Sequence, residues 1–411
     1  MNSIYRKLQK IIGLDLNYFL SGGLWGMVTL IVTTLSGIII SSLFSQIWPD
    51  DIYGRYSFLM TCIGFLSLIS LPGMSQAITQ AASEKKDSFF WNAYKIVFKY
   101  SLIGTVLLAL GSIYFYLRQN FVLSYATLLC SLVFPLNSTG TLFISYLNGK
   151  KKFDKATLYS VIGQFVSVVA TAAALILSGS LVLVAFLSLA SLAILNLFLT
   201  FKVVKKSTDK NSYPDLIKLG THLSFSQLFT ISADYFDKLL VAFLLGFSPN
   251  AVYAFALIFP TQIHNILKTF LTLGQPKITE LNQDVLNKTL IKKSLLLEFL
   301  VIIIVAFYII SAPFIFSILY PNYKNAVFVS QIFAFSLLYF PSNLLAINLI
   351  KLRKNKEIYI INIFYNILTV TSLLILLPFF GILGAAFSKI ISRFGYSLAI
   401  FYYFNKMKRE T

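Results

Sequence analysis

Three observations predict that this chain is an all-α integral membrane protein of about twelve transmembrane helices. Its residues are 57% hydrophobic and 12% charged, whereas soluble domains contain roughly 45–50% apolar and about 25% charged residues. Twelve apolar runs have the length of roughly 20 residues that a helix needs to cross the hydrocarbon layer. Basic residues are concentrated in every second loop between those runs, as they are in multi-pass membrane proteins.

The predicted spans follow one another through the whole chain with short connections. Their approximate cores lie at residues 22–45, 56–78, 96–117, 122–146, 157–177, 181–201, 222–246, 250–272, 294–318, 326–349, 358–378 and 382–403. The first run is longer than the apolar region of a signal peptide, and no small-residue cleavage site follows it, so we expect no cleavable signal. No phosphate-binding loop motif occurs, so we expect no transport driven by ATP bound to this chain.

Lysine and arginine are distributed unequally between alternate loops. The loops on one side of the predicted membrane, together with the two termini, hold 26 of the 34 Lys and Arg residues. The intervening loops hold only Arg55, Arg118 and Lys324, and the remaining five cations lie within spans. Because cytoplasmic loops carry the excess of Lys and Arg, we expect both termini in the cytoplasm. The net charge of +19 does not indicate nucleic-acid binding, since the cations are not gathered on one folded face.

The chain divides into four predicted regions. Residues 1–18 have apolar residues at helical spacing and three cations on other faces, which favours an amphipathic helix on the cytoplasmic membrane surface; an unstructured basic tail is the alternative. An N-terminal six-helix lobe at 19–205, a cytoplasmic linker at 206–218 and a C-terminal six-helix lobe at 219–411 follow. Cys62 and Cys130 lie within apolar runs and have no zinc-ligand spacing, so we expect no metal and no cofactor.

Short similarities relate the two halves of the chain. Span 4 contains Phe134-Pro135-Leu136-Asn137 and span 10 contains Phe340-Pro341-Ser342-Asn343, at an offset of 206 residues. The turns before Tyr53 and Tyr253, where spans 2 and 8 begin, are also similar. Because each half has an even number of spans, both halves enter from the same side, and the pseudo-two-fold axis runs along the membrane normal. Chance similarity between apolar sequences is the alternative interpretation.

Several segments resemble a known family, the polysaccharide (O-antigen type) flippases of the multidrug/oligosaccharidyl-lipid/polysaccharide exporter superfamily. The similar segments are Ser21-Gly22-Gly23, Ile52-Tyr53-Gly54-Arg55-Tyr56, Pro72-Gly73, Asp237-Lys238-Leu239-Leu240 and Ala251-Val252-Tyr253-Ala254. The resemblance extends to chain length, twelve spans and inside termini. It implies a V-shaped pair of six-helix bundles with a central cavity lined largely by spans 1, 2, 7 and 8. It also implies a flippase of the bacterial inner membrane that moves an undecaprenyl-diphosphate-linked oligosaccharide from the inner to the outer leaflet by alternating access. Other polysaccharide-assembly proteins are candidate partners.

Ionisable residues within spans are candidate functional residues, because a charge at mid-bilayer costs roughly 2.5–3.5 kcal/mol and needs a partner or a wet cavity. Span 7 carries Asp234, Asp237 and Lys238. Asp234 and Lys238 are four residues apart and are expected to pair on one helix face. Asp237 is then in excess, and it is the better candidate for coupling transport to H⁺ or Na⁺, with Asp234 second. A structural ion-pair cluster is the alternative.

Spans 8 and 12 carry further cations. His264 and Lys268 in span 8, with Gln262 nearby, form a polar stripe that we expect to bind the diphosphate from the cytoplasmic side, together with Lys238. The alternative is that Lys268 extends to the inner interface and that His264 makes an interhelical bond. The secondary candidates are Lys389 and Arg393 in span 12, for which we favour a structural role, and Glu298 in span 9, which they would face. Arg55 at the outer start of span 2 could meet the substrate at exit.

Other functions are less well supported by these residues. A multidrug or cation antiporter of the same fold would favour acidic and aromatic cavity residues, whereas spans 8 and 12 are basic. A membrane polysaccharide polymerase would normally have a large outer loop, which is missing here, so we expect no enzyme. A peptidoglycan-precursor flippase remains open, although that class usually has two additional spans.

Overall fold

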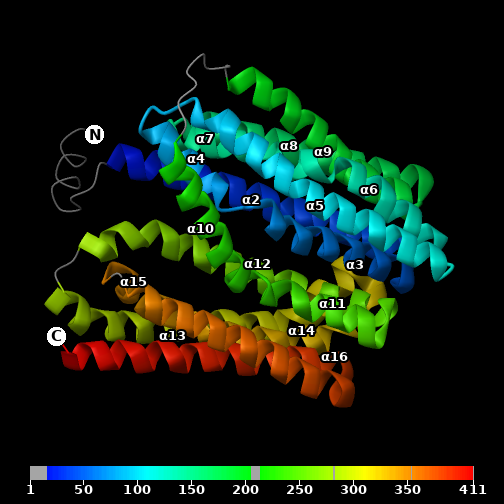
Figure 1. Ribbon diagram of the computed structural model, residues 1–411. Helices are drawn as coiled ribbons and strands as arrows, with labels where there is room; N and C mark the ends of the chain where they lie inside the picture. The colour runs from blue at the N-terminus through cyan, green and yellow to red at the C-terminus, as the bar shows by residue number, and fades with distance from the viewer. Residues whose placement is uncertain (1–15, 205–212, 281–282, 353, 411) are drawn as a thin grey trace, which may run out of the picture.

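The computed structural model describes residues 16–204, 213–280, 283–352 and 354–410, and these residues form helices joined by short connections, without a β-strand. The predicted surface helix at 1–18 and most of the predicted linker at 206–218 lie outside the described residues. The helices run nearly parallel to one another in two groups, with the start of the first helix and the end of the last helix at the same end of the molecule (Figure 1). We call this the terminal end and the opposite one the far end.

The first lobe contains the helices up to Val203. They are α2 (Leu16–Ile47), α3 (Asp50–Ser67), η1 (Leu68–Ser70), α4 (Met74–Ser83), α5 (Phe89–Leu117), α6 (Phe121–Gly140), α7 (Leu142–Gly149), α8 (Phe153–Ser178) and α9 (Leu181–Val203). Helix ends follow local chemistry. Asn120 caps α6 by accepting a hydrogen bond from the backbone N–H of Leu123, and Gly179 ends α8 in the left-handed conformation that glycine adopts without strain.

The second lobe contains the remaining helices. They are α10 (Pro214–Ile231), α11 (Ala233–Leu245), α12 (Phe247–Glu280), α13 (Gln283–Leu319), η2 (Pro321–Tyr323), α14 (Ala326–Phe335), η3 (Ser336–Tyr339), α15 (Ser342–Lys351) and α16 (Asn355–Glu410). The last of these is interrupted at Gly381, whose φ of 57° and ψ of −136° are not helical. Gly381 comes shortly after Pro378, and the interruption makes α16 two consecutive membrane passes.

The chain makes the twelve predicted membrane passes. By length and composition alone, nine helical segments of the described residues could cross a membrane, and one of them, Asn355–Met407, contains both halves of α16. Spans 7 and 8 correspond to α10–α11 and α12, which carry more polar residues. Two spans are broken at a proline: span 2 is interrupted between η1 and α4 around Pro72, and span 10 between η3 and α15 around Pro341.

The two lobes meet along the helices that the repeat relates. Span 2 of the first lobe packs against spans 7 and 8 of the second, through α3 with α11 and α12, and through α4 with α10. Gly54 lies so close to the chain of Phe247 that a Cβ atom there would overlap the carbonyl oxygen. Near the terminal end, Gly73 lies similarly close to the backbone of α10, and its backbone N–H donates to Ser224 Oγ at 2.9 Å.

The far end of the interface is closed by side chains of both lobes. Tyr53 of α3 packs on Phe255 of α12 with ring centroids 4.4 Å apart, and Phe255 in turn contacts Tyr323. The Ser41 and Tyr320 hydroxyls are 2.7 Å apart, and Asn322 Nδ2 donates to the carbonyl of Ser45. These contacts join α2 and α3 to α12 and η2, so the far end has a dense, shared core.

Candidate functional site

A cavity of about 600 Å³ lies inside the second lobe. Its lining side chains come from α10, α11, α12, α14, η3, α15 and both halves of α16. It extends along α12 from Leu257 to Gln275, which is about 27 Å at 1.5 Å per residue. Since α12 runs from the far end to the terminal end, the cavity reaches from mid-depth to the terminal end. This cavity is enclosed by spans 7, 8, 10, 11 and 12, so it is a different cavity from the central one lined by spans 1, 2, 7 and 8 that the resemblance implies.

Most of the charges within spans are gathered on the lining of this cavity. Of the five Lys and Arg residues in spans, four line it, and Lys99 on α5 is the exception. The four are Lys238, Lys268, Lys389 and Arg393. Two of the three in-span acidic residues, Asp234 and Asp237, line it as well. The cavity therefore holds four cations and two carboxylates, and with His264 neutral it has two positive charges in excess.

Lys389 is the centre of the ion pairs. Its Nζ lies 2.9 Å from Asp234 Oδ1 and 3.3 Å from Asp237 Oδ2, and its side chain is 4% exposed. The two carboxylates differ, since the side chain of Asp234 is 58% exposed and that of Asp237 is 2% exposed. Asp237 also accepts a hydrogen bond of 3.0 Å from the hydroxyl of Tyr253. The predicted pairing of Asp234 with Lys238 is wrong, because α16 supplies the cation.

Arg393 lies one helical turn from Lys389 on the same face of α16. Its Nη1 donates to Ser336 Oγ at 2.7 Å. The guanidinium carbon lies 5.1 Å from the ring centre of Phe333 and 5.0 Å from that of Tyr339, which is within the range of cation–π attraction. The prediction that Lys389 and Arg393 face Glu298 is wrong: Glu298 lies on α13 and is not among the cavity residues.

The span 8 cations line the same cavity. The His264 ring stacks on that of Tyr339, with centroids 5.9 Å apart, and meets Phe340 edge-on. Lys268 is exposed to the cavity on the next turn. Among the described residues, no carboxylate lies within ion-pair distance of the ammonium group of Lys268 or Lys238. Together with Arg393, for which no ion pair is found among the described residues either, these two lysines are cavity cations that an incoming anion can meet without displacing an ion pair.

Two of the predicted site residues lie elsewhere. Gln262 faces the first lobe, where its side chain accepts a hydrogen bond of 3.1 Å from Thr34 Oγ1, so it does not line this cavity together with His264, and its role in binding stays a prediction. Arg55 lies at the far end, where its Nε is 2.7 Å from Asp51 Oδ2 and its Nη1 donates to Asn120. Its charge is thus already paired within the first lobe.

The structure adds polar residues that were not among the candidates. Asn343, the last residue of the repeated Phe-Pro-x-Asn sequence, lines the cavity, as do Tyr339, Tyr365, Tyr396 and Asn362. The repeated sequence could have identified Asn343 as a candidate, whereas Tyr365 lies in no motif and carries no charge that would have singled it out. In the described part of the chain, no three His, Cys, Asp or Glu side chains come together as a metal site.

Comparisons with solved structures show the same fold. An inward-facing multidrug resistance MATE family transporter of the MOP superfamily matches with a TM-score of 0.72 and 16% identity, over 93% of this chain and 97% of that one. The outward-facing form matches with a TM-score of 0.66 and 16% identity, over 95% of each chain. A MOP superfamily transporter from Pyrococcus furiosus Vc1, whose binding pocket has reverse polarity, matches with a TM-score of 0.64 and 16% identity, over 95% of each chain.

The family follows from the sequence itself. No curated protein matches the chain significantly. The model of the family described as polysaccharide biosynthesis protein matches residues 19–272, which is more than half of the chain. That match covers the first lobe together with α10, α11 and most of α12. With the fold of MOP superfamily transporters, the chain belongs to the polysaccharide biosynthesis protein family.

Proposed function

We propose that this protein is a flippase that carries an undecaprenyl-diphosphate-linked oligosaccharide from the inner to the outer leaflet of the bacterial inner membrane. The observation that carries the proposal is the gathering of four of the five in-span cations in one cavity with two positive charges in excess. Each phosphate of a diphosphate diester keeps roughly one negative charge, as in a nucleic-acid backbone. The excess charge of the cavity therefore matches that of the headgroup.

The cavity also suits the direction of transport. The unequal loop charges favour a cytoplasmic terminal end, and the cavity reaches that end through Lys268 and Gln275. A headgroup entering from the inner leaflet first meets the unpaired ammonium groups of Lys268 and Lys238. Transferring a polar headgroup into hydrocarbon without partners costs several kcal/mol for each polar group. A polar, cationic cavity removes most of that cost, while the lipid tail stays in the bilayer.

In this proposal Asp234 and Asp237 first serve as the ion-pair partners of Lys389. Asp237 and Asp234 hold the ammonium group at the deep end of the cavity and neutralise it. A diphosphate that reaches this depth competes with the two carboxylates for Lys389 and meets Arg393 one turn away. Coupling to H⁺ or Na⁺ at Asp234 and Asp237 remains part of the proposal, and in it the coupling cation takes the place of the ammonium group.

A cation or multidrug antiporter is the second candidate, since two carboxylates do lie in the cavity. Both are within ion-pair distance of Lys389, so a cationic drug would have to displace a covalently attached ammonium group from a site with a positive excess. The same cavity chemistry suits any lipid-linked diphosphate saccharide, including a peptidoglycan precursor.

The test is a charge deletion in the cavity with a matched control. Lys268→Gln and Lys238→Gln should each lower translocation of a lipid-linked saccharide about tenfold, because each removes a charge-assisted contact of about 1.5–3 kcal/mol. Lys99→Gln removes an in-span cation outside the cavity and should change nothing. The measurement is surface glycan at equal protein level in cells that depend on this chain. Unchanged glycan in both cavity variants, or ethidium efflux that the chain supports, would overturn the proposal.

A further inference from the structure

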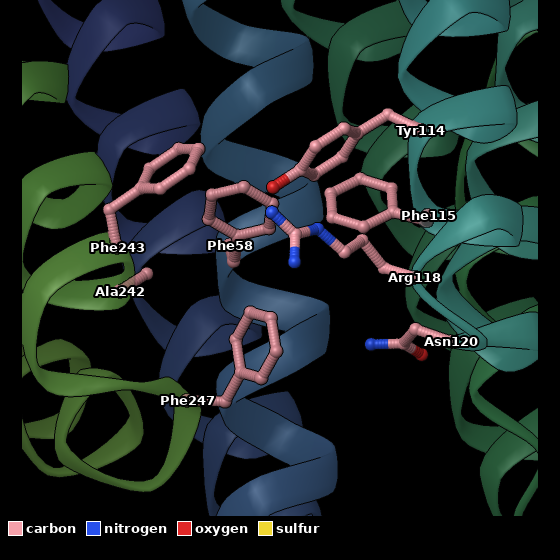
Figure 2. Close-up of a pocket in the computed structure, with 8 residues that line it drawn as sticks. All are labelled: Phe58, Tyr114, Phe115, Arg118, Asn120, Ala242, Phe243 and Phe247. Atoms are coloured by element: carbon pink, nitrogen blue, oxygen red, sulfur yellow. The ribbon is translucent and has the colours of Figure 1, made fainter.

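A second pocket, of about 240 Å³, lies at the far end between the two lobes. The first lobe supplies Phe58 from α3, Tyr114 and Phe115 from α5, and Arg118 and Asn120 from the connection to α6. The second lobe supplies Ala242 and Phe243 from α11 and Phe247 from α12. Figure 2 shows the guanidinium group of Arg118 pointing into the space that these rings enclose, with the amide nitrogen of Asn120 directed toward the same space.

The charge of Arg118 is not neutralised by any carboxylate in the described part of the chain. Within the described residues no carboxylate lies within ion-pair distance of its guanidinium group, which lies 5.7 Å from the ring centre of Tyr114. The neighbouring cation differs, because Arg55 is paired with Asp51 and donates to Asn120. Arg118 is therefore the cation of this pocket that is free to bind an anion.

The pocket is open sideways to the membrane. Tyr114 is 47% and Phe243 66% exposed on the surface that lipid covers, whereas Phe58 behind them is 5% exposed. A ligand can therefore reach Arg118 laterally at the level of one leaflet, with its chain along the aromatic rings. The volume is below the roughly 300 Å³ of the smallest pockets that hold drug-sized ligands, so the pocket fits a phosphate and the first chain units, and the sugars remain outside.

We propose that this pocket is an exit site that holds the phosphate end and the adjoining isoprene units of the lipid-linked saccharide after it has crossed to the outer leaflet. The inference rests on the proposed function. Charge complementarity selects an anionic headgroup, and a guanidinium group is well suited to phosphate. The position of the pocket between the lobes favours the transported lipid as its ligand, because α11 forms one side of this pocket and also one side of the cationic cavity in the second lobe.

The experiment uses the full-length protein in phosphatidylcholine nanodiscs. The probe is undecaprenyl diphosphate with a photoreactive diazirine in the isoprene unit next to the diphosphate, and adducts are located by peptide mass spectrometry. Two groups of adducts are expected, one at residues 114–120 and 242–247 and one in the cavity of the second lobe. Arg118→Gln should lower the first group about fivefold or more and leave the second unchanged, and Arg118→Lys should lower the first group less.

Further variants keep the test decisive. Lys324→Gln removes another exposed far-end cation outside the pocket and should change neither group of adducts. Phe243→Ala shortens the apolar side of the pocket at an exposed residue, and it should lower the first group even if Arg118→Gln folds poorly. Adducts confined to the cavity of the second lobe would overturn the exit site and leave the proposed function standing. Loss of the first group of adducts when excess phosphatidylglycerol is added would show that the pocket binds anionic lipids in general, and it would overturn the exit site. The absence of specific adducts at both sites would overturn both proposals.

Discussion

The ion pair of Lys389 makes a quantitative prediction for the stability of the second lobe. In Lys389→Met, Asp234 can be hydrated, because its side chain is 58% exposed, but Asp237 is 2% exposed and keeps a buried charge. Removing one partner of a buried ion pair typically costs about 3–5 kcal/mol. We therefore expect the thermal unfolding midpoint of the protein in detergent to fall by roughly 5–10 °C.

A second variant separates charge from packing. In the double variant Asp237→Asn/Lys389→Met the buried charge is gone, and the Asn side-chain oxygen can still accept the hydrogen bond of Tyr253. We expect this variant to recover at least half of the lost midpoint. Asp237→Asn alone leaves Lys389 paired with Asp234 and should cost about 1 kcal/mol. Lys268→Met, a cavity lysine without an ion-pair partner among the described residues, is the control and should stay within about 0.5 kcal/mol of the unchanged protein.

The reasoning would be refuted in either of two ways. Lys389→Met could unfold at the same midpoint as the unchanged protein, which would mean that the ammonium group does not neutralise Asp237. Alternatively, the double variant could be no more stable than Lys389→Met, so that the thermodynamic cycle gives no coupling between the two residues.

Two further predictions concern the lobe interface and the orientation of the chain. Gly54→Ala should lower the unfolding midpoint by the equivalent of about 1–3 kcal/mol, because the added methyl group overlaps the backbone of Phe247; Gly26→Ala, where nothing lies within 4 Å of the added atom, should not lower it. Green fluorescent protein fused after Thr411 should fluoresce and alkaline phosphatase fused there should be inactive, because the loop charges favour a cytoplasmic C-terminus. Active phosphatase would reverse the proposed direction of transport.

The helix pattern could be predicted from sequence because it depends on local properties. The length of an apolar run and the charges beside it decide whether a segment crosses the membrane, and both are visible in sequence. Spans 7 and 8 could be predicted for the same reason, although span 7 is divided at Ser232 into the short helices α10 and α11 and α12 does not stand out by hydropathy alone. Proline does not have the same predictive value, because the chain is broken near Pro72 and Pro341 but continues as a helix through Pro135 and Pro313.

The partners within the site could not be predicted in the same way, because periodicity describes only neighbours on one helix. Lys389 is 152 residues from Asp237 in the chain, and only the packing of α11 against α16 brings them together. The i,i+4 spacing of Asp234 and Lys238 suggested an ion pair within one helix, but in the structure Asp234 pairs with Lys389 of α16. Gln262 is different, since helix geometry alone could have excluded it: two residues from His264 is about 200° around the helix, which places Gln262 toward the first lobe.

α11 connects the two sites that we propose. Asp234 and Asp237 on its first turns line the cationic cavity, and Ala242 and Phe243 on its last turns line the exit pocket. Nine residues separate Asp234 from Phe243, a distance of about 13 Å along the helix. α11 is a separate segment from α10, since the helix is interrupted at Ser232. A headgroup that displaces the carboxylates from Lys389 thus acts on the same short helix that forms one side of the exit pocket.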